Sequence, residues 1–172
     1  QYVTEVKKLA DDRRQAADNQ KKMLAANVYL LAGDPTTPHA NPTALPDVPQ
    51  FDFSPLDQAV TRLKASAEAY DGALATNGAN LKGQDLSRLQ NLMQSLDQTL
   101  LLDRGLPGRS WYKNLIYAPG RFTGYGAKTL PGIREAIEEG RWADATSYIG
   151  FTVTALNAYS ARLDQATAVL KH

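Results

Sequence analysis

Apolar residues recur at intervals of three and four through most of the chain, and this pattern restricts the fold more than any other feature. Such spacing places side chains on one face of an α-helix, which can then be buried against other helices. Ser54 and Pro55 are typical of an N-cap and a first helical position, and Asn77-Gly78 is typical of a helix end. The clearest stripe lies between them: Leu56, Ala59, Val60, Leu63, Ala67, Tyr70 and Leu74.

Four further segments predict helices. Residues 1–32 contain neither Gly nor Pro and predict a long helix that ends at Gly33. Pro131 and Gly140 bound a short helix, and residues 142–170 predict another long one. Asp85 is placed to cap a helix whose leucine stripe predicts core packing, with a partner-binding groove as the alternative: Leu86, Leu89, Leu92, Met93, Leu96 and Leu100.

The fold class follows from these helices. Strand-forming residues are concentrated only from Trp111 to Tyr117, a stretch too short to build a sheet. The chain is therefore predicted to be all-α, with four major helices in a four-helix-bundle-like domain. Five of the nine prolines fall within residues 34–50. Because proline lacks a backbone donor and favours extended backbone, we expect a Pro-rich strap there.

Composition excludes several classes of function. The 19 basic and 18 acidic side chains leave a net charge of +1, whereas a nucleic-acid-binding domain normally carries a basic excess. The absence of cysteine excludes disulfides, thiolate metal sites and cysteine nucleophiles. No apolar run approaches the roughly 20 residues of a membrane-spanning helix. The chain begins with Gln1 rather than Met, so we expect it to be a piece of a longer protein.

No catalytic or metal site is predicted within the chain. The two histidines, His39 and His172, lack co-ligands at a spacing that would hold zinc. No Gly-x-Ser-x-Gly motif is present, and Gly124 to Thr129 lacks the spacing and the preceding strand of a phosphate-binding loop. Glu135, Glu138 and Glu139 share the predicted short helix, and we interpret them as a solvated face.

Residues 103–132 interrupt the helical pattern and predict a long ordered loop. This segment contains six of the twelve glycines and five of the fourteen aromatic residues. Long structured loops in compact domains are often functional. Its cations outnumber the single acid Asp103, so either an anionic group docks there or the loop simply closes the end of the bundle: Arg104, Arg109, Lys113, Arg121 and Lys128.

The same segment carries a recognisable motif. It reads Gly105-Leu-Pro-Gly-Arg-Ser-Trp-Tyr-Lys-Asn-Leu-Ile-Tyr-Ala-Pro119, followed by Gly124-Tyr125 and by Leu130-Pro-Gly-Ile-Arg-Glu-Ala-Ile137. Together with Val48-Pro-Gln-Phe-Asp-Phe-Ser-Pro-Leu56, it resembles the transferrin receptor-like dimerisation domain. That domain is found at the C-terminus of glutamate carboxypeptidase-type zinc peptidases such as prostate-specific membrane antigen. The resemblance covers residues 48–170.

The resemblance implies a domain organisation and partners. Residues 48–172 would be the helical dimerisation domain, and residues 1–47 the N-terminal helix and strap that end the peptidase region. The expected partners are a second copy of the protein and the preceding peptidase domain. Zinc would be held by that domain, with no cofactor in this chain. Histidine and carboxylate metal ligands in the preceding sequence would support this interpretation, and their absence would favour a stand-alone adaptor or receptor-type domain.

The resemblance also implies two substrate-binding positions. In glutamate carboxypeptidases an adjacent Lys-Tyr pair in this loop holds the terminal carboxylate of the substrate. Tyr125 matches the tyrosine, but Gly124 stands where the lysine is expected. A tyrosine hydroxyl still donates a hydrogen bond, whereas loss of the ammonium removes a charge-assisted one. The chain is thus expected to be a non-catalytic homodimerisation domain that contributes a loop to the substrate pocket of the whole protein, with a weakened preference for C-terminal glutamate.

Overall fold

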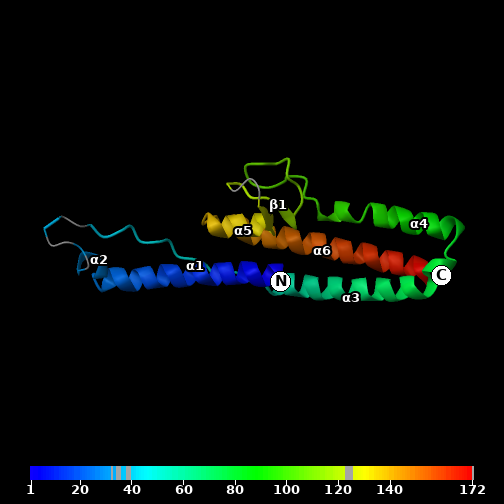
Figure 1. Ribbon diagram of the computed structural model, residues 1–172, viewed down its shortest axis with the longest axis horizontal. Coiled ribbons are helices and arrows are strands. Elements are labelled where there is room, and N and C mark those ends of the chain that lie inside the picture. The colour runs from blue at the N-terminus through cyan, green and yellow to red at the C-terminus, as the bar shows by residue number, and fades with distance from the viewer. Residues whose placement is uncertain (32, 34–35, 38–39, 123–125, 172) are drawn as a thin grey trace.

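The computed structural model confirms the all-α class (Figure 1). It describes residues 1–31, 33, 36–37, 40–122 and 126–171. Two short strands form one antiparallel pair, with Tyr117 opposite Thr129. The elements are α1 (Tyr2–Ala25), α2 (Val28–Leu31), α3 (Ser54–Asn77), η1 (Gly78–Asn80), α4 (Gly83–Gln94), η2 (Asp97–Leu100), β1 (Tyr117–Pro119), β2 (Ala127–Thr129), α5 (Pro131–Glu138) and α6 (Trp142–Leu170).

Helix α6 is the centre of the packing. It contacts α3 along much of its length and also contacts α4, η2 and α5. Figure 1 shows α6 between α3 and α4, with α1 continuing the line of α3 towards α5. The buried residues of α3 are Leu56, Ala59, Ser66 and Ala73. Three of them are small and lie seven residues apart, so they allow α3 to pack closely against α6. The four long helices therefore form a staggered bundle.

The hydrophobic core has two parts. The larger cluster joins α1, α3, α5, α6 and the loop before α5, and its best-buried members include Val6, Leu56, Ile133, Ile137 and Ala145. The smaller cluster lies where the C-terminal ends of α3 and α6 meet α4, and it comprises Ala73, Leu89, Ala166, Val169 and Leu170. Helix α1 is joined to α5 by an ion pair between Arg134 and Glu5, whose atoms lie 2.8 Å apart.

Four predicted helix boundaries are wrong. Asp85 lies inside α4 and does not cap it, because that helix begins at Gly83. The first helix ends at Ala25 rather than Gly33, because Asn27 adopts a left-handed φ of 52° and the chain restarts as α2. The helix with the leucine stripe ends at Gln94, and its last leucine belongs to η2. Ser54 is the first residue of α3 and not its cap. Asp52 accepts a hydrogen bond from the Ser54 amide instead, at 2.9 Å, and bonding to Ser54 lowers the pKa of Asp52.

Residues 40–50 run back along α1 without forming helix or strand. Polar side chains of α1 hold this segment in place. The Arg14 guanidinium donates to the Pro49 carbonyl at 3.0 Å, and the Gln20 side chain accepts from the Leu45 amide at 2.6 Å. Lys21 pairs with Asp47, and that hydrogen bond raises the pKa of Lys21. Residues 45–49 are therefore held against one side of α1.

Candidate functional site

The loop between η2 and α5 spans residues 101–130, and its described part, residues 101–122 and 126–130, is held by many hydrogen bonds but has little regular secondary structure. Asn114 shapes its middle, because its side-chain oxygen accepts hydrogen bonds from the amides of Ile116 and Tyr117 at 2.8 and 3.1 Å. Backbone hydrogen bonds also join positions 6 to 15 residues apart, with donor–acceptor distances of 2.8–3.0 Å. Written as amide donor to carbonyl acceptor, they are Leu102 to Lys113, Leu106 to Tyr112, Leu115 to Leu100, and Leu130 to Ile116. The described part of the predicted loop is therefore ordered, and it lies beside α5 and the start of α6 (Figure 1).

A buried ion pair anchors the loop to α5. Arg109 and Glu135 are 6% and 2% exposed, and their side-chain atoms lie 2.7 Å apart. The same carboxylate oxygen accepts the Arg121 amide at 3.0 Å, and the Arg109 guanidinium also donates to the Pro119 carbonyl. Glu135 thus holds two separate parts of the loop. The interpretation of Glu135 as part of a solvated face is wrong, because its side chain is buried. No local pattern indicates this burial, since the paired residues Arg109 and Glu135 are 26 positions apart in the sequence.

Tyr148 of α6 forms a second anchor. Its buried hydroxyl donates to the Gly105 carbonyl at 2.6 Å, and burial raises the pKa of that hydroxyl. Its ring lies against Gly132, where an added Cβ would be 2.1 Å from a ring carbon. Leu130, the residue before α5, takes a left-handed φ of 48° and is almost fully buried, at 3% exposure. Loop, α5 and α6 are consequently packed as one unit.

Four of the five loop cations pair with carboxylates of the chain, and Arg109 is one of them. Arg121 pairs with Glu139 at 3.1 Å, Lys128 pairs with Glu138, and Lys113 lies 3.3 Å from Asp103. Arg104 lies over the ring of Phe151, 5.5 Å from its centroid. Glu135, Glu138 and Glu139 are therefore partners of loop cations, which leaves Arg104 as the cation of the described loop for which no carboxylate partner is seen.

The two predicted substrate-binding residues, Gly124 and Tyr125, lie outside the described residues. The residues on either side of them are described. The Gly120 amide donates to the Gly126 carbonyl at 3.0 Å. The β1–β2 pair begins next to this hydrogen bond, with Pro119 opposite Ala127. The described part of the loop exposes three aromatic side chains, Trp111 at 72%, Tyr117 at 62% and Phe122 at 80%. Exposed apolar groups of this size often mark contact surfaces.

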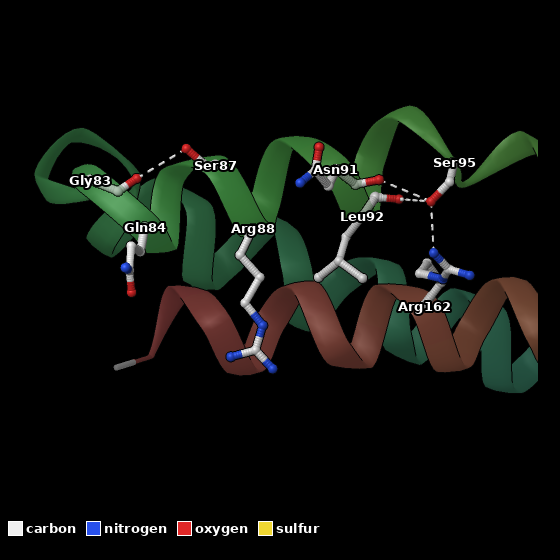
Figure 2. A pocket seen from close by; sticks show the side chains of 8 residues that line it. All are labelled: Gly83, Gln84, Ser87, Arg88, Asn91, Leu92, Ser95 and Arg162. Carbon is white, nitrogen blue, oxygen red and sulfur yellow. Dashed lines mark hydrogen bonds between the residues drawn. The ribbon is translucent and has the colours of Figure 1, made fainter.

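A separate open groove of about 770 Å³ lies between α4 and α6. Figure 2 shows its wall of α4 side chains above Arg162 of α6, which donates to the Ser95 hydroxyl at 2.6 Å. Arg88 contributes a second guanidinium, and none of the described residues that line the groove is acidic. With no base beside either serine in this lining, the groove does not form a nucleophilic site. The lining residues are Gly83, Gln84, Ser87, Arg88, Asn91, Leu92, Ser95 and Arg162.

Among the described residues, no group of three or more His, Cys, Asp or Glu side chains is arranged to hold a metal ion. His39 and His172 are not among the described residues. None of the described helices is both long enough and apolar enough to cross a membrane.

The sequence matches the transferrin receptor-like dimerisation domain over residues 51–164, about two thirds of the chain. The chain belongs to that family. The match begins just before α3 and ends within α6, so it includes the whole loop of residues 101–130 and both of its anchors. The resemblance stated from the loop motif is therefore confirmed.

Two curated relatives of this dimerisation domain extend the comparison. A probable glutamate carboxypeptidase of Arthroderma benhamiae is 30% identical over 102 residues, which cover 59% of this chain and 14% of the relative. A probable glutamate carboxypeptidase of Arabidopsis thaliana is 34% identical over 87 residues, which cover 50% of this chain and 11% of the relative. The chain thus spans only a small part of the length of the relatives it matches.

Proposed function

We propose that the chain is the non-catalytic C-terminal homodimerisation domain of a glutamate carboxypeptidase-like zinc exopeptidase. The observation that carries this proposal is the family match over residues 51–164. The names of two relatives, both probable glutamate carboxypeptidases, support the peptidase part of it. Residues 48–172 would form the dimerisation domain, and residues 1–47 would complete the peptidase region that precedes it.

The zinc ions of this proposal would belong to the preceding peptidase domain. The described part of the chain contains no group of three or more His, Cys, Asp or Glu side chains that could hold a metal ion. Histidine and carboxylate ligands in the preceding sequence would support a zinc peptidase. A preceding sequence without them would instead indicate a receptor-type protein that has lost its metal site.

We expect the full-length protein to be a homodimer in solution. Most soluble homo-oligomers are two-fold symmetric, and the family is described by its role in dimerisation. Sedimentation equilibrium at micromolar concentration should give twice the mass of one chain. A protein that remains monomeric at these concentrations would contradict the homodimerisation proposal.

We further propose that Tyr125 holds the terminal carboxylate of the substrate in the full-length enzyme. Tyr125→Phe removes one hydrogen bond to a charged group, about 1.5–3 kcal/mol, so kcat/KM should fall roughly 10- to 150-fold. Gly124→Lys should raise the relative activity on peptides that end in glutamate, because it adds a charge-assisted hydrogen bond. Kinetics on a matched pair of peptides, one ending in Glu and the other in Leu, measure both effects.

The matched control is Tyr117→Phe, a change of the same kind at an exposed tyrosine of the same loop. It should leave kcat/KM within about twofold of the original value, because surface substitutions away from a site have small effects. If Tyr125→Phe behaves like Tyr117→Phe and Gly124→Lys shifts no preference, the loop has no role in the substrate pocket.

A further inference from the structure

The open groove between α4 and α6 carries positive charge that the chain does not neutralise. Arg88 and Arg162 line it, and its lining has no acidic side chain. Among the described residues, no carboxylate pairs with either guanidinium. Six other arginines do have a carboxylate partner: Arg14, Arg62, Arg109, Arg121, Arg134 and Arg141. The two arginines of the groove are therefore available to an anionic ligand.

The acidic residues close to the groove in sequence belong to other surfaces. Asp85 of α4 lines a separate pocket beside the end of α6. Asp164 of α6 pairs with Arg62 of α3 at 3.5 Å. Asp97 follows in η2 and does not line the groove. Because a cleft lined by one sign of charge concentrates ions of the opposite sign, this groove attracts anions.

Arg162 is held in a fixed position at one end of the groove. Its guanidinium donates to the Ser95 hydroxyl at 2.6 Å, and that hydroxyl donates to the Asn91 carbonyl at 2.9 Å (Figure 2). The hydrogen bond to Ser95 uses one of the five N–H donors of an arginine side chain. A guanidinium that is already held loses less conformational freedom when a ligand binds, which favours binding.

The two guanidiniums enter the groove at different levels. Arg88 and Ser95 are seven residues apart on α4, which is about 10 Å along the helix axis at 1.5 Å per residue. Arg162 lies at the level of Ser95, since the two are hydrogen-bonded. This spacing suits a ligand with two separate anionic groups better than one small oxyanion. An extended peptide advances about 3.3 Å per residue, so two acidic residues three positions apart would span it.

The remaining lining favours a peptide over other polyanions. The side-chain amides of Gln84 and Asn91 both donate and accept hydrogen bonds, as the backbone of a peptide requires. Leu92 is half-buried and offers an apolar contact between the two charged positions. Nucleic acids are bound through many phosphate contacts and through bases stacked on aromatic rings. The lining has only two cations and no aromatic side chain.

We propose that the groove between α4 and α6 binds an extended acidic peptide segment. Arg88 and Arg162 would each pair with one carboxylate, and the two acidic residues would be three positions apart. Guanidinium and carboxylate groups often pair through two parallel hydrogen bonds, which gives such a site selectivity for carboxylates. The inference goes beyond the proposed function and does not depend on it, because it uses only the lining of this groove.

The test measures peptide binding to the full-length protein by fluorescence anisotropy. The probe is the fluorescein-labelled peptide Gly-Glu-Pro-Leu-Glu-Gly, in which proline favours extended backbone. It should bind with a Kd on the order of 100 µM. The same peptide with glutamine in place of both glutamates should bind at least about tenfold more weakly, because it lacks the charges that pair with the arginines.

Three variants assign the binding to the groove. Arg162→Gln should raise the Kd of the acidic peptide about tenfold or more, and Arg88→Gln, at an exposed position where folding is not at stake, about three- to fivefold. Lys82→Gln is the control. It removes an exposed cation just before α4 that does not line the groove, so the Kd should change less than about 1.5-fold.

Three outcomes would overturn the inference. The first is equal binding of the acidic and glutamine peptides, or no binding of either because another part of the full-length protein covers the groove. The second is an Arg88→Gln variant that binds the acidic peptide as Lys82→Gln does. The third is a 16-nucleotide single-stranded DNA that binds at this groove more tightly than the peptide, which would indicate a general polyanion site. None of these results bears on the homodimerisation proposed above.

Discussion

Replacing Glu135 with alanine should destabilise the chain by about 3–5 kcal/mol. The substitution leaves the guanidinium of Arg109 buried without its carboxylate, and it removes the acceptor of the Arg121 amide. Breaking a buried ion pair from one side is strongly unfavourable because the remaining charge has lost both water and partner. Urea unfolding of the 172-residue chain, followed by circular dichroism, measures the loss.

Two controls separate this effect from a general effect of losing a charge. Glu138→Ala, on the same helix, breaks only a partly exposed pair with Lys128 and should change the free energy of unfolding by about 0–1 kcal/mol. Replacing Arg109 and Glu135 together with methionine should be milder than Glu135→Ala, because no buried charge remains. Equal effects of Glu135→Ala and Glu138→Ala would show that the pair is not a structural anchor.

Gly105→Ala should be nearly as damaging, with a loss of about 3 kcal/mol from two causes. Gly105 has a φ of +64°, a region in which a Cβ costs about 1–2 kcal/mol. In addition, a Cβ there would lie 2.1 Å from the carbonyl oxygen of Ser110, and a backbone atom held in a turn cannot move aside easily. Overpacking of this kind adds about 1–3 kcal/mol. Thermal and urea unfolding of the chain would both register it.

Gly83→Ala is the matched control for Gly105→Ala. Gly83 has a similar φ of +60°, but a Cβ built there meets nothing within 4 Å. It should therefore show only the strain of the left-handed backbone, about 1–2 kcal/mol. The difference between the two variants isolates the clash with Ser110. If both lose the same stability, the loop relaxes around the new methyl group and the tight turn after Gly105 is unimportant.

Local patterns predicted the helices well. The stripe from Leu56 to Leu74 defines α3, and Pro131 and Gly140 bracket α5, because helix propensity and capping act over a few residues. The leucine stripe of α4 and η2 does not have one uniform environment. Leu89 and Leu96 are buried core residues, whereas Met93 and Leu100 are half-buried and line an apolar cleft beside α3 and α6. Periodicity identifies an apolar face without telling what covers it.

The candidate site depended on contacts that are distant in sequence. Glu135 resembles its neighbours Glu138 and Glu139 in the sequence, yet only Glu135 is almost fully buried. The difference arises because Arg109 reaches it from the loop, and the Tyr148 hydroxyl fixes that loop from a helix 43 residues away. The loop motif was recognised through resemblance, but the physical reason for its order could not be obtained from local spacing.

Helix α1 has a consequence for how this protein is cut into fragments. The family match begins at residue 51, yet Val6 and Ala10 of α1 are 0% and 1% exposed within the larger core cluster, and Glu5 is paired with Arg134. A fragment that starts at residue 51 would expose the side chains these residues cover and leave Arg134 without that partner. The segment that matches the family is therefore shorter than the unit that shares one core, and a fragment meant to keep this core should include α1.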